Sequence, residues 1–412
     1  MPEPLARTRP LLEVADVIRS HGAAFIKKYG NHLSATHKKA LRELALCRTA
    51  ALGGHREYCL DCGAARIAYN SCRNRHCPKC QALSRARWLE REACYLLPVA
   101  YHHVVFTLPA EVAELVSANP VQLYNLLMQS AAQTLRGVAA NPKRLGAQVG
   151  VLMVLHTWGQ NLHHHPHAHC VVTGGGLSCN ERGQVQAAPR WLSCRPGFFL
   201  PVRVLSRVFR GTFLAGLRGL QAQGKLKLPS RLHEATAFTA WLSPLYAKDW
   251  VVYAKPPFGG PEQVLQYLAR YTHRVAISNR RLVKLQDGKL TFRYRDYADS
   301  RKEKFLTLSA EEFLRRFVRH VLPKGFMKIR HYGLLASRQR EARLRLARRL
   351  LLGITVLPRA ASAAIEPAEL PRCPQCGSVR QLRVELLPPL ASSPFAAAGP
   401  EAPGPPSADD TS

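Results

Sequence analysis

The sequence is poor in acidic residues. It has 27 Asp plus Glu against 59 Lys plus Arg, which gives its 412 residues a formal net charge of +32. A fold does not need such an excess, and a surface dominated by positive charge attracts a polyanion. The composition therefore indicates a nucleic acid as partner.

Long apolar runs are also absent. No stretch approaches the roughly 20 apolar residues that span a bilayer, and residues 1–10 are too polar and proline-rich for a secretory signal. We therefore expect a soluble cytoplasmic protein with no membrane partner and no organic cofactor. In a reducing compartment the twelve cysteines are expected to be free, so clustered ones indicate metal ligands before disulfides.

Two pairs of cysteines have the spacing of zinc knuckles. Cys59 and Cys62 are followed, after fourteen residues, by Cys77 and Cys80. Two such pairs at this separation predict one tetrahedral zinc site. Three further residues of the segment could form a second site or replace a ligand of the first: His55, Cys72 and His76.

The cysteine-rich segment is also basic. Arg73, Arg75 and Lys79 lie between the cysteines, where they could contact DNA phosphates. The alternative is a zinc site that only stabilises the fold, since structural zinc contributes folding energy whatever else it does.

Five histidines lie within residues 163–169, and an apolar strand follows that Gly174, Gly175 and Gly176 are expected to stop. In a strand, His167 and His169 project on one face, and the residues between and after them project on the other. Two neighbouring imidazoles can hold a divalent metal. The alternative is a solvated histidine loop, because tracts rich in histidine are weak metal signals.

The predicted elements form an α+β pattern with a mostly antiparallel sheet. Strands are expected at residues 101–108, at 149–158, in the histidine stretch and at 250–254, and helices within 11–50 and at 111–138 and 202–222. Asp287-Gly288 predicts a hairpin turn between residues 281–285 and 290–294. Ser309 and Glu312 form a capping box that predicts a helix over residues 313–321.

A further helix is expected from Pro261, because proline suits the first helical position. Tyr267 and Tyr271 are four residues apart and therefore share one face of it. By itself, such a pair is more often half-buried packing than a site.

Positive charge is concentrated in residues 270–350. This region has 23 Lys plus Arg against 7 Asp plus Glu, which is half of the chain's excess in about a fifth of its length. It predicts a DNA path beside the tyrosine helix, with aromatics such as Phe292 and Tyr294 for base stacking; the alternative is an ordinary basic helix surface. The basic residues nearest the tyrosines are Arg270, Arg274, Arg280 and Arg281.

The order of these motifs resembles a known family. His167-Ala168-His169 resembles the histidine–hydrophobic–histidine motif of HUH endonucleases, and Tyr267 to Tyr271 resembles their two-tyrosine motif. With the cysteine-rich module before them, residues from about 15 to about 340 resemble a rolling-circle insertion-sequence transposase with an N-terminal zinc-binding domain. Its fold would be an HUH endonuclease-like antiparallel sheet flanked by helices, preceded by a small helical and zinc-binding domain.

The resemblance implies a metal-dependent endonuclease and strand transferase that acts on single-stranded DNA at the element's ends and at its target. Tyr267 and Tyr271 would be the nucleophiles, each forming a 5′-phosphotyrosine, and His167 and His169 would hold Mg²⁺ or Mn²⁺. The third metal ligand is open among His156, Gln160 and His165, although the segment from His156 to Gln160 matches the family. Zn²⁺ would occupy the N-terminal domain, and the place of action would be the nucleoid of a bacterium.

Three regions are expected. Residues 1–97 form the helical and zinc-binding domain, residues 98–350 the nuclease domain, and residues 351–412 a disordered tail rich in Pro and Ala. Cys373 and Cys376 in that tail resemble half a zinc knuckle; no Cys or His follows them, so a closed site would need ligands from upstream.

Two other functions remain compatible with the sequence. A replication initiator or relaxase would share the nuclease site but usually lacks this zinc module. A non-catalytic zinc regulator would bind DNA and use the histidines and tyrosines only for packing.

Overall fold

We analysed the chain in a computed structural model, which describes residues 11–258, 263–264, 267, 275–296, 299–352 and 372–390. The chain forms two compact units, each assembled from separate segments. The first combines residues 1–79, 278–315 and 371–412, and the second combines residues 80–277 and 316–370. The division after Lys79 falls inside the turn that carries Cys77 and Cys80.

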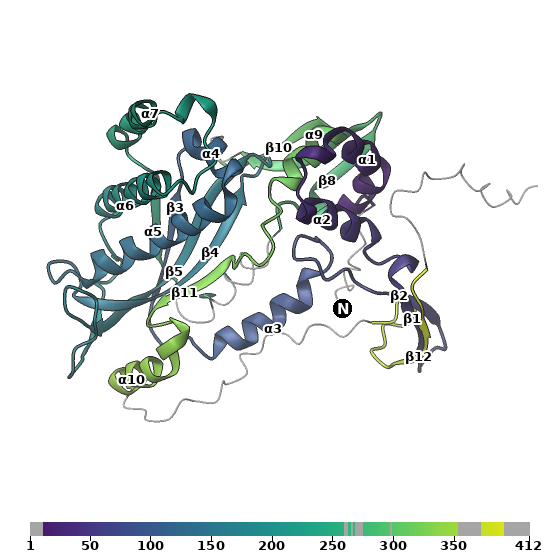
Figure 1. Cartoon of the computed structure of the whole chain (residues 1–412). Coiled ribbons are helices and arrows are strands. Elements are labelled where there is room, and N and C mark those ends of the chain that lie inside the picture. The colour runs from purple at the N-terminus through teal and green to yellow at the C-terminus, as the bar shows by residue number, and fades with distance from the viewer. Residues whose placement is uncertain are drawn as a thin grey trace, which may run out of the picture. The chain divides into compact units, whose positions relative to one another are not determined.

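The second unit is built on a six-stranded sheet whose described pairings are all antiparallel, in the order β11-β4-β5-β3-β7 with β6 paired to β5 (Figure 1). The strands are β3 (Tyr101–Thr107), β4 (Ala147–Trp158), β5 (His164–Ser178), β6 (Trp191–Ser193), β7 (Val252–Phe258) and β11 (Ile329–Gly333). The helices are α3 (Gln81–Ala93), α4 (Ala113–Ala118), α5 (Pro120–Ala140), α6 (Val202–Ala222), α7 (Ala235–Ala247) and α10 (Arg340–Leu352).

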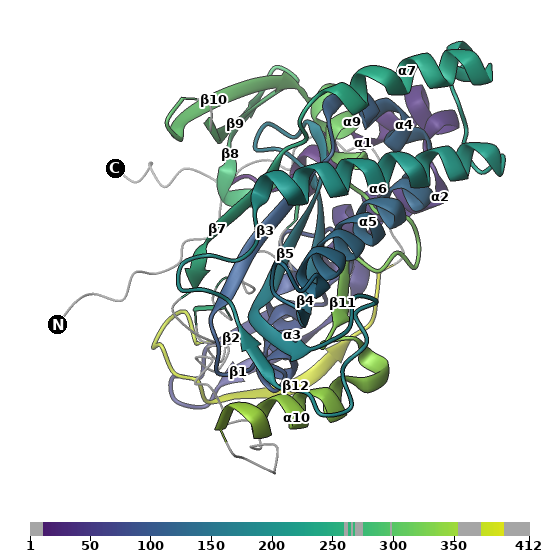
Figure 2. The ribbon, with the colours of Figure 1, turned by 90° about the vertical axis from the view of Figure 1, so that its left-hand side faces the viewer.

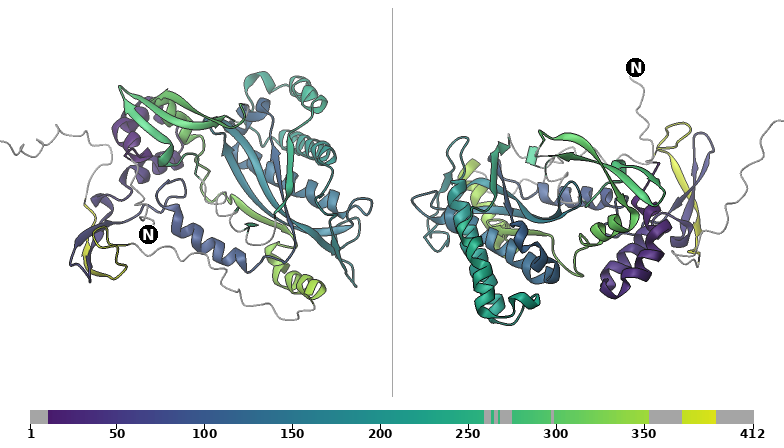
Figure 3. Two further views of the ribbon diagram at one scale, coloured as in Figure 1. Left: turned by 180° about the vertical axis from the view of Figure 1, so that it is seen from behind. Right: turned by 90° about the horizontal axis from the view of Figure 1, so that it is seen from above.

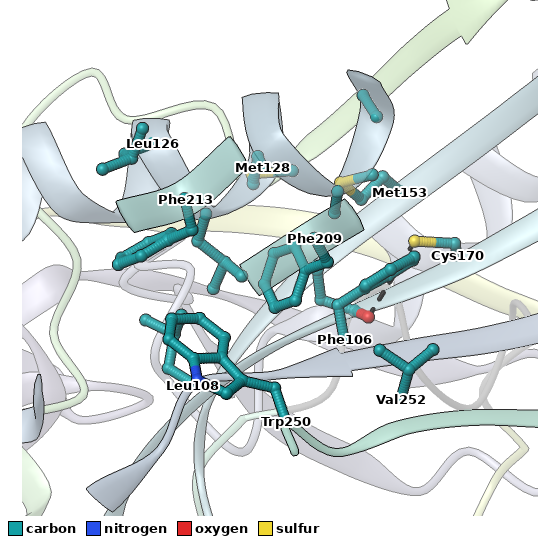
Figure 4. Packing of buried hydrophobic residues seen from close by; sticks show 14 of the residues in the cluster. Phe106, Leu108, Leu126, Met128, Met153, Cys170, Phe209, Phe213, Trp250 and Val252 are labelled. Atoms are coloured by element: carbon teal, nitrogen blue, oxygen red, sulfur yellow. Dashed lines mark hydrogen bonds between the residues drawn. The ribbon is translucent and has the colours of Figure 1, made fainter. Parts of the chain in front are cut away.

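One face of this sheet is covered by α5 and α6, and α7 packs beside α6 (Figure 2). Alternate residues of each strand point to this face, for example Val104 in β3 and Met153 in β4. They pack against the apolar sides of these helices in a large buried cluster. Aromatic rings fill its centre: Phe106, Phe209, Phe213 and Trp250 (Figure 4). Burial of this much apolar surface is the main stabilisation of the unit.

The opposite face packs on α3 and α10. Leu152, Val154 and Val171 project on this side and contact a second buried cluster with Trp88 of α3 and Leu344 of α10. The odd-numbered residues of β5 share this face, because side chains alternate along a strand. This second face is the one that carries the candidate site.

Strand β5 is longer than the sequence predicts, because the glycines do not stop it. Gly176 continues the strand at a point where β4 approaches closely: a Cβ atom there would lie 2.2 Å from the carbonyl oxygen of Gln148. The glycine cluster is therefore a place of close strand packing.

The first unit contains a pair of helices, α1 (Val14–Tyr29) and α2 (Ala35–Leu46). Val17, Ile18, Leu41 and Leu44 are buried, as their helical spacing predicts. A capping box of Glu13 and Asp16 begins α1.

Two small antiparallel sheets complete the first unit. One has the order β12-β1-β2, and the other has the order β10-β9-β8 (Figure 3). Their strands are β1 (Gly54–Cys59), β2 (Ala65–Tyr69), β8 (Leu282–Gln286), β9 (Lys289–Asp296), β10 (Lys302–Ser309) and β12 (Gln381–Leu387). Helix α9 (Ala310–Val318) follows β10 and crosses the division between the units.

The architecture is α+β with an antiparallel sheet flanked by helices and a helical, cysteine-rich region at the N-terminus, as predicted. The expected tail needs correction, because part of it is folded: residues 372–390 contain β12, which pairs with β1. The hairpin of β8 and β9, which the sequence assigns to the nuclease domain, groups with the N-terminal helices. Among the helices that the structure describes, none combines the length and the apolar character needed to cross a bilayer.

Candidate functional site

Three histidines meet on the second face of the central sheet. His156 lies at the end of β4, directly opposite His167 of β5, and His169 lies two residues further along β5. Their ring nitrogens lie within 4.8 Å of one another. The sequence placed His167 and His169 on one face of a strand, and the structure has Ala168 and Cys170 buried on the other.

Hydrogen bonds orient these rings. Nδ1 of His167 lies 2.7 Å from the carbonyl oxygen of His165, and a carbonyl can only accept, so Nδ1 carries the proton in the neutral ring. The lone pair is then on Nε2, which lies 3.1 Å from Nε2 of His169. This is the tautomer that a histidine needs to bind a metal through Nε2.

A fourth histidine, His103 of β3, lies behind His169. Its Nε2 is 3.0 Å from Nδ1 of His169, and the two rings stack with centroids 5.2 Å apart. Burial lowers the pKa of His103 to about 3, and the positive charge of Lys255 acts in the same direction. His103 is therefore neutral at physiological pH.

Tyr267 completes this arrangement. Its hydroxyl lies 2.5 Å from Nε2 of His103 and 3.3 Å from Nδ1 of His169. The phenol is thus held beside the histidine group, as the motif order predicts. Tyr271, Arg270 and Arg274 lie outside the described residues.

The other two candidate ligands occupy different positions. Gln160 lies in the turn between β4 and β5, and His165 is exposed at the start of β5, where its carbonyl orients His167. Of the three candidates, His156 is the one whose ring nitrogen belongs to the group with His167 and His169.

The cysteines are grouped differently from the prediction of one site. Cys77 and Cys80 gather with Cys47 and Cys72, and within each group all sulfurs lie within 4.8 Å of one another. Cys59 and Cys62 gather instead with the pair from the tail: Cys373 and Cys376. The chain therefore carries two four-thiol groups, each with the donor set of a structural zinc site.

Cys72, one of the three possible additional ligands, lies in the first of these groups, whereas the two histidines of that segment are in neither group. His55 lies beside Glu57, with 2.6 Å between Nε2 and Oε1, and Arg66 pairs with the same carboxylate. His76 belongs to none of the metal-ligand groups among the described residues.

Several basic residues predicted to contact DNA instead contact other residues of the first unit. Lys79 forms an ion pair with Glu13 at 2.5 Å and is only 12% exposed. Arg75 is half-buried, and burial lowers its pKa. Arg281 lies over the ring of Phe292 and donates to the carbonyl oxygen of Arg293. Among the members of the predicted set that the structure describes, Arg73 and Arg280 are exposed.

Phe292 also differs from its predicted role. It is fully buried and packs against Phe313, so it cannot stack on a base in this conformation. The alternation of β9 gives the reason, because Leu290 and Phe292 project into the core and Arg293 projects outward.

Two functional candidates were missed from the sequence. His103 belongs to a strand that was predicted, but its position beside His169 follows from the register of β3 on β5, in which Val105 is opposite His169. Cys47 has no second cysteine at knuckle spacing, so the CxxC pattern could not include it.

Comparisons with known proteins identify the family of the chain. Residues 150–343 match the family described as "Putative transposase", and residues 17–108 match the transposase zinc-binding domain. The chain is 48% identical over 395 residues to the "Putative transposase y4qJ" of Sinorhizobium fredii, an alignment that covers 93% of this chain and 97% of that protein. It is 29% identical over 307 residues to the transposase for insertion sequence element IS801 of Pseudomonas savastanoi pv. phaseolicola, which covers 73% and 70% of the two chains.

No solved structure matches the chain significantly. The transposase match contains His156, His167 and His169, and the zinc-binding match contains the cysteine-rich segment. The chain therefore belongs to the two-tyrosine insertion-sequence transposases that carry a zinc-binding domain at the N-terminus.

Proposed function

We propose that this transposase cuts and rejoins single-stranded DNA through a covalent 5′-phosphotyrosine during rolling-circle transposition of its element. The observation that carries the proposal is the position of Tyr267, whose hydroxyl lies 3.3 Å from His169 in a group of imidazoles able to bind a metal. A phenol has an ordinary pKa near 10, so it needs such an electrostatic environment to attack a phosphate at neutral pH.

His156, His167 and His169 are proposed as the metal ligands. Three neutral imidazoles suit first-row metals, whereas Mg²⁺ prefers oxygen donors, so the donor set favours Mn²⁺ of the two candidate ions. A metal bound there would neutralise charge on a non-bridging oxygen of the scissile phosphate. Gln160, in the turn that follows β4, is proposed as a further ligand.

His103 positions the nucleophile. Its neutral ring faces both the Tyr267 hydroxyl and the Nδ1 of His169, so it orients the phenol and fixes a ligand. Attack of the tyrosine oxygen on phosphorus then breaks the bond to the 3′ oxygen of the preceding nucleotide. The phenol loses its proton, the departing oxygen gains one, and the phosphodiester energy is kept in the new ester.

Tyr271 would supply the second nucleophile of the reaction. In the helix that the sequence predicts, Tyr271 comes one turn after Tyr267, and residues four apart on a helix are about 5–6 Å apart at Cβ, so its hydroxyl would need only a small movement to reach the same phosphate position. Two tyrosines allow a second cut while the first is still esterified. This division of roles rests on the sequence motif.

The N-terminal zinc-binding domain is proposed to recognise DNA. Zn²⁺ at Cys47, Cys72, Cys77 and Cys80 would fix the turn that precedes α3. Arg73 and Arg280 are exposed and are the residues that we propose for phosphate contacts. If its substrate is chromosomal DNA, the protein acts at the bacterial nucleoid.

The test is a cleavage assay with a single-stranded oligonucleotide that carries the end of the element, in the presence of Mn²⁺. Wild type should give a covalent adduct on a denaturing gel. Tyr267→Phe and Tyr271→Phe should each retain some cleavage at one end and fail in complete transposition, and the double variant should give no adduct. Phenylalanine keeps the ring, so a loss reports on the hydroxyl. An adduct mapped to another residue, or to a 3′ phosphate, contradicts the mechanism.

A further inference from the structure

We infer that Cys59, Cys62, Cys373 and Cys376 bind a second Zn²⁺, and that this ion fastens the C-terminal segment to the N-terminal unit. Neither family match extends to residues 373–376, because they end at residues 108 and 343. The inference concerns metal binding and folding, so it does not depend on the proposed nuclease activity.

The two cysteine pairs lie in turns of the same structure. In the first turn, the amide of Gly63 donates to the carbonyl oxygen of Cys59 at 2.9 Å; in the second, the amide of Gly377 donates to that of Cys373 at 2.9 Å. Gly63 has φ 72° and Gly377 has φ 73°, a left-handed conformation that favours glycine. The tail sequence therefore forms the same knuckle as the N-terminal sequence.

A second hydrogen bond repeats in both turns. The amide of Cys59 donates to the carbonyl oxygen of Ala64 at 2.9 Å, and the amide of Cys373 donates to that of Ser378 at 2.7 Å. Because the two turns share both hydrogen bonds, each presents its two sulfurs in the same way. Two knuckles that face each other give the arrangement of a zinc ribbon.

The sulfur distances fit a metal and exclude disulfides. Sγ of Cys59 is 3.4 Å from Sγ of Cys376, and Sγ of Cys62 is 3.6 Å from Sγ of Cys373. A disulfide requires about 2.05 Å. Tetrahedral zinc with bonds of about 2.3 Å separates its sulfurs by roughly 3.8 Å, close to the distances in this group.

Strand pairing, a backbone hydrogen bond and an ion pair hold the two turns opposite each other. β12 pairs with β1, with Gln381 opposite Cys59, and the amide of Leu60 donates to the carbonyl oxygen of Arg380. The Arg380 guanidinium also pairs with Asp61 at 2.8 Å. In Figure 1 the yellow β12 lies beside the N-terminal β1 and β2. The second knuckle thus has a defined place in the N-terminal sheet.

Apolar burial cannot be what holds β12 in place. Leu382, Val384 and Leu386 are 52%, 58% and 76% exposed. A small sheet with little buried apolar surface is marginal in water, and docking the C-terminal segment also costs conformational entropy. A structural metal that binds only the closed arrangement supplies the missing stabilisation.

The test is the zinc content of the purified full-length protein, measured by elemental analysis after removal of loosely bound metal. Wild type should contain two zinc ions per chain. Cys373→Ser/Cys376→Ser and Cys59→Ser/Cys62→Ser should each contain one, and the variant with all four changes should also contain one. Cys94→Ser/Cys194→Ser, which alters two cysteines outside both groups, should keep two. One zinc in wild type, or two in Cys373→Ser/Cys376→Ser, overturns the inference.

Hydrogen exchange tests the fastening role directly. Amides of residues 381–387 should exchange slowly in wild type and at least tenfold faster in Cys373→Ser/Cys376→Ser, while those of α1 and α2 stay unchanged. Arg380→Ala is the matched control, because it removes the ion pair with Asp61 and keeps all four thiols. It should keep two zinc ions and most of the protection. Equal protection of residues 381–387 in wild type and in the cysteine variant would show that the metal does not hold this strand.

Discussion

At the scale of single residues, every proposed metal ligand on β5 is oriented by a second group. The backbone of His165 fixes His167, and His103 fixes His169. Binding of the metal and orientation of the ligands can therefore be separated by mutation. Two predictions follow from this separation.

Replacing a ligand should abolish cleavage and leave DNA binding nearly intact. We expect His167→Ala or His169→Ala to lower the rate of adduct formation by at least 100-fold, whereas the Kd for the oligonucleotide should change by less than about threefold, because dispersed phosphate contacts dominate affinity. EDTA should have the same effect on wild type. Cleavage at the normal rate in either variant or in excess EDTA would contradict the assignment.

Replacing His103 should weaken cleavage without removing a ligand. We expect His103→Ala to lower the rate by roughly 10- to 100-fold, the usual cost of losing a group that orients a metal ligand. His103→Gln should recover part of that loss, because its amide can still form a hydrogen bond with the Tyr267 hydroxyl. A role in packing alone would give equal rates for the Ala and Gln variants.

The sequence was informative about these residues where the interaction is local. The period of a strand places His167 and His169 on one face without knowledge of any partner. The contact of His103 with His169 depends on the register of two strands 66 residues apart, which the sequence does not show. The grouping of Cys373 with Cys59 is likewise a contact between residues far apart in the sequence, and the sequence does not show it.

At the scale of elements, local sequence patterns predict helices and turns correctly when every helix-breaking residue is taken into account. The helix predicted at residues 202–222 is α6, and the Asp-Gly turn does join β8 to β9. The single helix predicted over residues 111–138 is divided into α4 and α5, because Pro120 begins a new helix. That proline was visible in the sequence and should have ended the first helix.

A buried and a half-buried histidine join elements of the second unit and should make it sensitive to acid. His320, just after α9, donates from Nε2 to the carbonyl oxygen of Leu162, and His164 of β5 lies 2.9 Å from the Tyr124 hydroxyl. Burial lowers the pKa of His320 to about 3 and that of His164 to about 4. Each folded pKa lies below the unfolded value near 6.5, so the stabilisation is complete above pH 6.5 and is lost as pH falls towards 3–4.

We therefore expect the second unit to lose about 1 kcal/mol per pH unit for each histidine between pH 6.5 and pH 4. Chemical denaturation monitored at several pH values measures this slope. His320→Gln, which keeps a donor for the Leu162 carbonyl and cannot titrate, should have a shallower slope. An unchanged slope in this variant would show that His320 does not contribute.

At the scale of the whole molecule, the units do not follow the order of the chain. Residues near position 14 and near position 279 belong to one unit, where the amide of Val14 donates to Asn279 at 3.1 Å. Lys28 likewise pairs with Glu311. Domain boundaries read from composition assume contiguous segments, so the sequence could identify the zinc module but not the distant segments that complete it.

Two truncations distinguish a folded C-terminal segment from a disordered tail. Deleting residues 353–412 removes β12, Cys373 and Cys376, whereas deleting residues 391–412 removes none of them. If residues 351–412 were a disordered tail, both deletions would be harmless. We expect the longer deletion to contain one zinc ion and the shorter deletion to contain two.

The longer deletion should also destabilise the first unit, because β1 loses one of its two neighbouring strands and the knuckle at Cys59 loses its metal. A loss of 1 kcal/mol lowers Tm by roughly 2–4 °C in a unit of about 150 residues, so a shift of at least that size is expected. Exchange of amides in β1 and β2 locates the effect, and the buried strands β4 and β5 should be unaffected. A longer deletion with two zinc ions and a wild-type Tm would mean that Cys59 and Cys62 complete their site without the C-terminal segment.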